Sequence, residues 1–98
     1  MNRDQVLAIL RGHESELRAA GIKGLSLFGS TARGDYRPDS DIDLVAVFDE
    51  TRRISLLGVV GIEQQISRML DRTVELVEEA MLKPRVRKSV EAEAVRAF

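Results

Sequence analysis

The stretch that most constrains the fold runs from residue 28 to residue 44 and reads Phe-Gly-Ser-Thr-Ala-Arg-Gly-Asp-Tyr-Arg-Pro-Asp-Ser-Asp-Ile-Asp-Leu. It places a Gly-Ser turn after the apolar segment 25–28 and two carboxylates, Asp41 and Asp43, at the head of a second apolar segment. Because side chains alternate along a strand, both carboxylates are expected on one face of a sheet. The stretch therefore predicts a polar site built at neighbouring strand ends.

The hydrophobic pattern around this stretch predicts alternating helices and strands. We expect helices over 3–20, 54–70 and from Pro84 onward, strands over 25–28, 41–48 and 73–77, and a helical turn over 30–33. The order αβαβαβα with short links predicts an α/β (α+β) fold. Its small mixed sheet would have about three to four strands flanked by helices.

Length and composition exclude several classes of protein. The 98 residues suffice for one domain, residues 1–98, and the net charge of −1 argues against general nucleic-acid binding. The absence of cysteine and the single histidine exclude thiolate and multi-histidine zinc sites. No apolar run is long enough to span a membrane and no secretory signal is visible, so we expect a cytoplasmic protein.

The Gly-Ser turn suits an anion. Gly29 lets the backbone approach a ligand closely, and free N–H groups at the start of a helical turn attract negative charge. The Ser30 hydroxyl can donate to a phosphate oxygen, and Arg33, one turn later, can reach the same face. Taken alone, the segment is better explained as a simple strand-to-helix turn with Ser30 as its N-cap.

The acidic residues suit a metal ion. Two neighbouring carboxylates repel each other, but they become favourable when Mg²⁺ lies between them and phosphate oxygens complete its shell. Glu75, inside the apolar segment 73–77, is a third candidate, either as a base or as a second metal ligand. The alternatives are that Ser40-Asp41 merely ends a loop while Asp43 is an exposed strand residue, and that Glu75 is an edge-strand residue paired with Arg72 or another surface cation.

Together, Gly-Ser-x-x-Arg-Gly, Ser-Asp-x-Asp-Leu and an acid on a later strand resemble the DNA polymerase β-like nucleotidyltransferases. The length narrows the resemblance to the minimal nucleotidyltransferase (MNT) domain, of the kind found as the antitoxin in HEPN/MNT toxin–antitoxin pairs. The resemblance implies that Gly29, Ser30 and Arg33 bind the nucleotide. It also implies that Asp41, Asp43 and Glu75 are catalytic and bind one or two Mg²⁺ ions.

The resemblance further implies an enzyme that transfers a nucleoside monophosphate, with AMP from ATP the family expectation, to a hydroxyl of a protein. The length leaves no residues for an acceptor domain, so we expect a partner, a HEPN-domain ribonuclease encoded nearby. The third acid is usually Asp in such families and here is Glu75, which leaves open a binding module that neutralises its partner by steric capture. Self-association is also left open.

Two further features have competing interpretations. Lys83, Arg85, Arg87 and Lys88 cluster at the start of the last predicted helix, where positive charge opposes the helix dipole. The cluster could contact an acidic partner or simply form a solvated face. Tyr36, in the motif loop, could be exposed for contact or cover Pro38.

Overall fold

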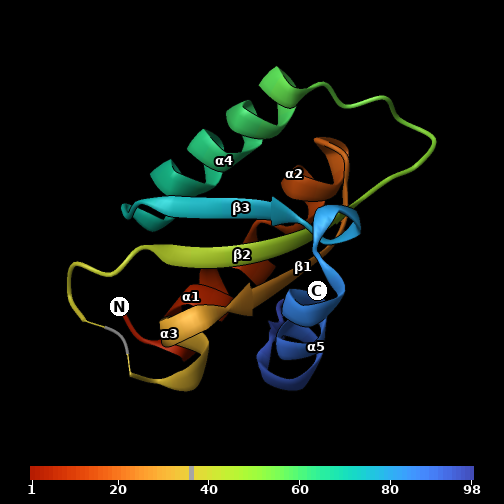
Figure 1. Cartoon of the computed structure of the whole chain (residues 1–98). Coiled ribbons are helices and arrows are strands. Elements are labelled where there is room, and N and C mark those ends of the chain that lie inside the picture. Colours follow the sequence, from red (N-terminus) through yellow and green to blue (C-terminus); the bar gives the residue numbers. More distant parts are fainter. Residues whose placement is uncertain (36) are drawn as a thin grey trace.

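A four-stranded mixed sheet forms the centre of the molecule, in the order β3-β2-β1-β4 (Figure 1). The computed structural model describes residues 1–35 and 37–98, so Tyr36 lies outside the described residues. β1 (Ile22–Phe28) is antiparallel to β2 (Ile42–Phe48) and to β4 (Val95–Arg96), whereas β2 and β3 (Val74–Glu78) are parallel. The predicted mixed α/β sheet is confirmed.

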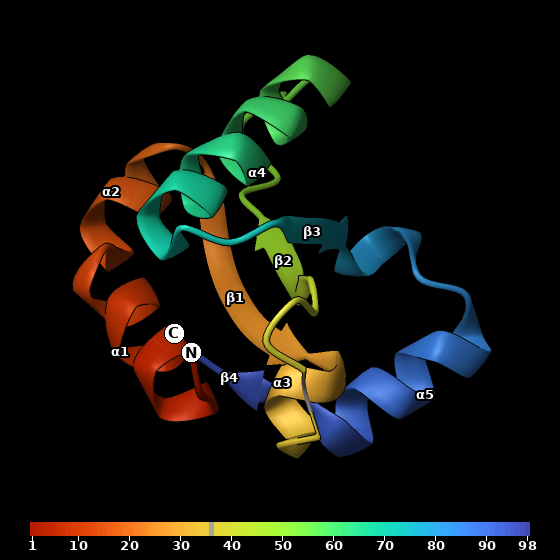
Figure 2. The same ribbon diagram turned by 90° about the vertical axis from the view of Figure 1, so that its left-hand side faces the viewer.

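Helices cover the two faces of the sheet unequally. They are α1 (Arg3–Gly12), α2 (Glu14–Ala19), α3 (Gly29–Arg33), α4 (Leu56–Leu70) and α5 (Pro84–Glu93), with the 3₁₀ turn η1 (Glu79–Met81) before α5. Figure 2 shows α1, α2 and α4 on one side of the strands and α5 on the other. The face toward α5 is therefore covered by one helix and leaves room for a site.

The core lies between the sheet and the first group of helices. Alternation along β2 sends Ile42 and Leu44 into this core, where they are 2% and 0% exposed. Leu10, Leu17 and Ile66 meet them from α1, α2 and α4 and are also fully buried. Each such side chain contributes about 1.5–3 kcal/mol when buried. The same alternation turns the intervening strand residues toward the other face.

The predicted helix over 3–20 is two helices. Asn2 and Gln5 cap α1 reciprocally through two hydrogen bonds of 2.9 Å. The chain leaves helical geometry at His13 (φ −106°, ψ 15°), whose ring nitrogen lies 2.8 Å from the Glu16 carboxylate. The apolar periodicity continues across the break to Leu17, so the pattern of apolar residues could not reveal it.

The C-terminal strand β4 was not predicted. α5 ends at Glu93, and Ala94 turns the chain into an extended conformation (φ −68°, ψ 144°). The Ala97 N–H then donates to the Leu25 carbonyl at 2.8 Å, and Arg11 Nε of α1 donates to the Ala97 carbonyl at 2.8 Å. These long-range bonds hold a two-residue strand that no local pattern specifies.

No helix in the described residues, 1–35 and 37–98, is both long and apolar enough to cross a membrane.

Candidate active site

The pairing of the central strands brings the predicted site residues together. β2 and β3 are in register with Asp43 beside Glu75, and β1 and β2 place Phe28 beside Asp43. Gly29 follows Phe28 directly, so the Gly-Ser turn begins next to the Asp43 carboxylate. Asp43 is half-buried, whereas Glu75 is exposed.

The Asp43 carboxyl is influenced by the charges of both other acids. Partial burial raises the pKa of the Asp43 carboxyl above its ordinary value, and the negative charges of Glu75 and Asp41 raise it further. The Arg33 guanidinium acts in the opposite direction and lowers the same pKa. The three acids therefore hold more negative charge than Arg33 balances.

Gly29 is required by its contact with Asp43. Its backbone has φ +77°, a left-handed conformation that favours glycine, and its residue is buried. A Cβ atom built at this position would overlap the Asp43 carboxylate. The turn can thus approach the acid only because residue 29 has no side chain, which supports a role for Gly29 in shaping the site.

The helical turn after Gly29 differs from the alternative considered for Ser30. Phe28, not Ser30, is the N-cap of α3, and Ser30 lies within its first turn. N–H groups in a first turn have no intrahelical partner, so they are available to an anion. The Ser30 carbonyl accepts hydrogen bonds from the N–H groups of Gly34 (2.9 Å) and Asp35 (3.1 Å), which closes the turn.

Arg33 lies close enough to act on the charge of Asp43. Its Nε is 3.2 Å from the Asp35 carboxylate and its Nη1 is 3.4 Å from that of Glu93, with all three side chains well exposed. Exposed ion pairs contribute little, typically about 0–1 kcal/mol. The guanidinium can therefore turn toward a bound phosphate at small cost.

The interpretation of Glu75 as a partner of Arg72 is wrong. Arg72 instead donates to the Ser40 carbonyl at 2.7 Å, and no ion pair within residues 1–35 and 37–98 includes Glu75. β3 is indeed an edge strand, but its Glu75 faces Asp43 rather than a cation. This leaves the Glu75 carboxylate available for chemistry.

A cavity of about 260 Å³ opens beside Asp43 and Glu75, between the sheet and α5. Its lining is Phe28, Asp43, Leu44, Val45, Glu75, Val77, Leu82, Val86 and Val90. The two carboxylates are its only charged members among the described residues. Sequence reasoning missed the wall that Leu82 and α5 add to this cavity, although Val86 and Val90, two apolar residues four positions apart, were a signal for it.

The carboxylates fit Mg²⁺ as an incomplete ligand set. Among residues 1–35 and 37–98, no group of three or more acidic or histidine side chains is arranged so that it could hold a metal ion. Mg²⁺ does not require such a group, because it is usually held by one or two carboxylates together with water and substrate phosphates. Hard oxygen donors, the raised pKa of Asp43 and the close backbone at Gly29 all suit a magnesium–phosphate complex.

Known proteins are similar to this chain in sequence and in architecture. The family model described as "Nucleotidyltransferase domain" matches residues 10–97. The protein adenylyltransferase MntA of Thermococcus cleftensis is 34% identical over 93 residues, which are 94% of this chain and 92% of that protein. A solved structure described as a minimal nucleotidyltransferase superposes with a TM-score of 0.81 and 34% identity, covering 97% of this chain and 95% of the other.

A more distant structure shares the fold. It is a chain from the complex of a tri-AMPylated Shewanella oneidensis HEPN toxin with its MNT antitoxin, with a TM-score of 0.68 and 17% identity over 94% of this chain and 71% of the other. The extent of the family match, the identity to curated relatives and the arrangement around Asp43 agree. The chain belongs to the nucleotidyltransferase domain family and shares the fold of the minimal nucleotidyltransferase structure.

Proposed function

We propose that this nucleotidyltransferase moves AMP from ATP onto a hydroxyl of a HEPN-domain partner and thereby acts as its antitoxin. The observation that carries the proposal is the pairing of Asp43 with Glu75 beside the Gly29 turn, with Asp41 two residues earlier and close enough to act on the charge of Asp43. The name of the Thermococcus relative, protein adenylyltransferase, supports AMP and a protein acceptor. The AMPylated HEPN toxin found with an MNT antitoxin supports the kind of partner.

Each residue has a proposed part in the transfer. Asp41 and Asp43 hold Mg²⁺, with Glu75 available to a second ion, and the metal supplies positive charge to the triphosphate. Ser30 and the N–H groups of the turn bind the outer phosphates, and Arg33 turns from its surface pairs to join them.

The reaction exchanges one bond for another. The acceptor oxygen forms a bond to the α-phosphorus of ATP, and the bond from that phosphorus to the oxygen bridging to the β-phosphate breaks. Pyrophosphate leaves with the bonding electrons, and the hydroxyl proton passes to the Glu75 carboxylate. Such a positioned base typically contributes about 10²–10⁴-fold to the rate.

Isotope position provides the test. The chain and the purified HEPN-domain partner are incubated with Mg²⁺ and ATP labelled either at the α-phosphate or at the γ-phosphate. We expect the partner to carry the α-label and not the γ-label. After incubation with the Asp41→Asn/Asp43→Asn variant, we expect the partner to carry neither label. If wild type leaves the partner unlabelled yet still silences it, steric capture is the correct function.

A further inference from the structure

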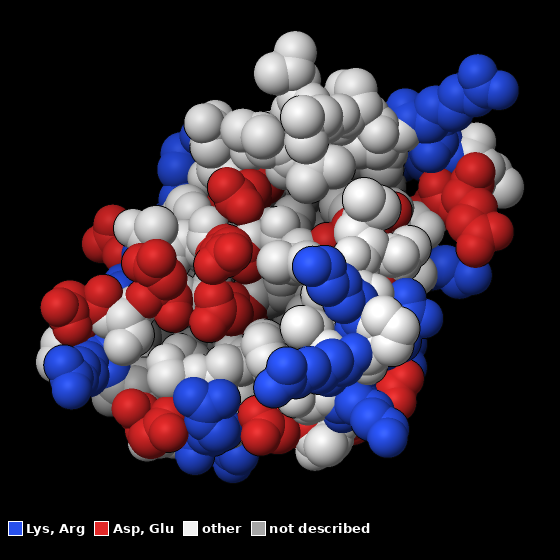
Figure 3. Space-filling view, in the orientation of Figure 1, with Lys and Arg blue, Asp and Glu red and all other residues white. Residues whose placement is uncertain are grey.

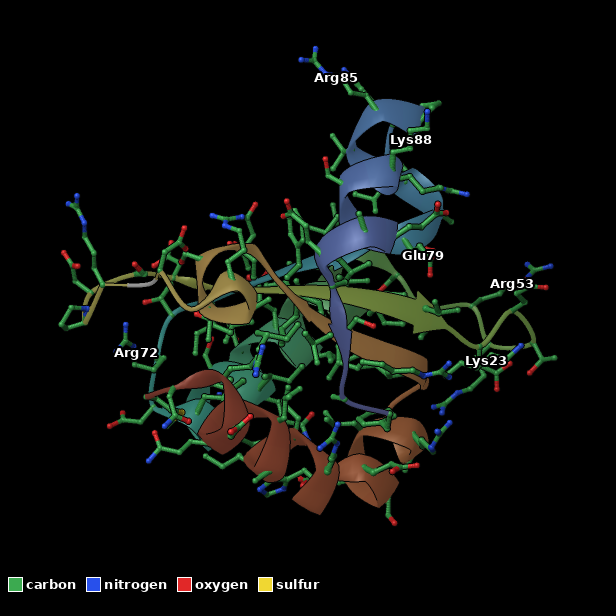
Figure 4. All side chains as sticks on the ribbon, turned by 90° about the horizontal axis from the view of Figure 1, so that it is seen from below. Lys23, Arg53, Arg72, Glu79, Arg85 and Lys88 are labelled. Carbon is green, nitrogen blue, oxygen red and sulfur yellow. The ribbon has the colours of Figure 1, made fainter. Side chains whose placement is uncertain are left out.

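The basic cluster at the start of α5 has no role in the proposed transfer. Lys83, Arg85 and Lys88 are exposed, and no ion pair within residues 1–35 and 37–98 involves any of them. Arg87 is engaged differently, because its guanidinium donates to the Glu79 carbonyl at 3.0 Å. Figure 4 shows Arg85 and Lys88 extending outward from α5, with Glu79 on the same part of the molecule.

These cations are unfavourably placed for folding. Lys83 is the N-cap of α5 and has no capping hydrogen bond from its side chain, and the first turn of the helix contains no acid. Positive charge near a helix N-terminus is disfavoured by the helix dipole, typically by about 0.3–1 kcal/mol per residue. Neither local pairing nor the dipole accounts for the cluster, so a bound anionic group would satisfy it best.

The cluster adjoins the cavity and exposed apolar side chains. Leu82 and Val86 line the cavity beside Asp43 and Glu75, and the exposed cations Lys83 and Arg85 are their direct neighbours along the chain. Val86 is 40% exposed and Met81, in η1, is 75% exposed. Figure 3 shows basic side chains over α5 and acidic ones over the left-hand ends of the strands, with uncharged atoms between them.

We infer that this surface, made by Met81, Leu82, Lys83, Arg85, Val86 and Lys88, docks an acidic segment of the acceptor protein. The inference rests on the proposed function. The apolar residues receive apolar side chains of that segment, the cations pair with its carboxylates, and the acceptor hydroxyl enters the cavity toward Glu75. A segment lying along α5 would thus deliver its hydroxyl to the carboxylates from the side opposite the core.

Charge favours a protein over a nucleic acid as the occupant. Lys83 and Arg85 adjoin Leu82 and Val86, which line the cavity together with Asp43 and Glu75, and the whole chain has a net charge of −1. Nucleic-acid binding needs a continuous basic surface that neutralises several phosphates. An acidic segment with apolar residues at its contact points matches both components of the surface.

Charge reversal with a matched control tests the docking. Arg85→Glu/Lys88→Glu is compared with Lys23→Glu/Arg53→Glu, which makes the same change at two exposed cations that lie apart from Arg85 and Lys88 (Figure 4). The probes are the HEPN-domain partner and a random copolymer of glutamate and tyrosine, with a lysine–tyrosine copolymer as the opposite charge. Association rates are measured by surface plasmon resonance at low and high salt.

We expect Arg85→Glu/Lys88→Glu to slow association with the acidic probes about tenfold or more at low salt, and the control pair to change it little. The stabilisation of both variants by Mg²⁺ and ATP should equal that of wild type. Equal association of the two variants would overturn the docking surface. The docking surface would also be overturned if wild type bound a single-stranded RNA more tightly than the acidic probes and Arg85→Glu/Lys88→Glu lost this RNA binding.

A pair of bulky substitutions tests entry into the cavity. Val86→Trp narrows the cavity, and Val60→Trp on α4 is its control, since both valines are 40% exposed. We expect Val86→Trp to reduce AMP transfer at least tenfold while ATP binding stays unchanged. Loss of ATP binding would instead assign the cavity to the nucleotide base and overturn the inference. If wild type binds these probes through α5 yet transfers no AMP, only the proposed function fails.

Discussion

Replacing Gly29 by Ala should damage the site, because the added Cβ would collide with the Asp43 carboxylate. Comparison with Gly34, a nearby glycine, separates this collision from the strain of the backbone. Gly29 and Gly34 both have positive φ, +77° and +86°. A Cβ at Gly29 would overlap the Asp43 carboxylate, whereas one at Gly34 would have no atom of residues 1–35 and 37–98 within 4 Å beyond its chain neighbours. Gly34→Ala is therefore a control for the strain alone.

The expected costs follow from these geometries. An L-residue in the left-handed region costs about 1–2 kcal/mol, which both variants share. In Gly29→Ala, the Asp43 side chain must also leave its rotamer, at a further cost of about 0.5–1.5 kcal/mol. Since 1 kcal/mol shifts Tm by about 4–8 °C in a domain of this size, Gly34→Ala should lose about 4–16 °C and Gly29→Ala several degrees more.

Ligand-induced stabilisation gives the sharper distinction. At a ligand concentration of 100 Kd, binding stabilises the fold by about 2.7 kcal/mol. Differential scanning fluorimetry with Mg²⁺ and ATP should show this shift in wild type and Gly34→Ala and lose it in Gly29→Ala. When Asp43 is also replaced by Ala, Gly29→Ala should reduce the stability of the fold only by the backbone strain measured for Gly34→Ala. If Gly29→Ala and Gly34→Ala have equal Tm values both without and with Mg²⁺ and ATP, the reasoning is refuted.

Three further predictions concern the same site. Asp41→Asn/Asp43→Asn should keep the fold by circular dichroism but abolish the thermal shift given by Mg²⁺ and ATP, and an undiminished shift would exclude both residues as metal ligands. Ser30→Ala should weaken the binding of ATP more than tenfold in calorimetry, since a hydrogen bond to a charged group contributes about 1.5–3 kcal/mol. The binding of AMP should weaken less, and equal losses of affinity for ATP and AMP would contradict the placement of Ser30 at the outer phosphates. The pKa of Asp43 in the folded protein is raised above the ordinary 3.8, so ionisation of this carboxyl opposes folding. The stability that is present below pH 3.8 is therefore lost as the pH rises through the pKa that Asp43 has in the folded protein. Without metal, Asp43→Asn should therefore melt above wild type at pH 7, with the difference vanishing toward pH 3.8, and a lower Tm at pH 7 would contradict the sign.

The central part of the fold could be predicted because local signals agreed there. The run from Ile42 to Phe48 has the alternation that sends Ile42 and Leu44 inward and turns Asp43 outward. Ser55, Gly34 and Pro84 are helix-boundary residues of the expected types. The predicted helix over 54–70 accordingly differs from α4 by two residues at its start.

The remainder depends on contacts between distant residues. β4 exists because Ala97 pairs with Leu25 and Arg11 holds the C-terminal backbone, and neither contact has a local sequence signal. The meeting of Asp43 and Glu75 required the parallel register of β2 and β3, which the sequence only suggested. The wall that Leu82 and α5 add to the cavity was missed for the same reason.

Glu75 tests the central claim most directly, because it distinguishes a working transferase from a binding module. The HEPN-domain partner is co-expressed with wild type, Glu75→Gln or Glu75→Asp, and its intact mass is measured after incubation with ATP and Mg²⁺. We predict added AMP with wild type, a rate about 10²–10⁴-fold lower with Glu75→Gln at unchanged ATP binding, and retained transfer with Glu75→Asp. Transfer at the wild-type rate by Glu75→Gln, or no added mass with wild type, would contradict the account.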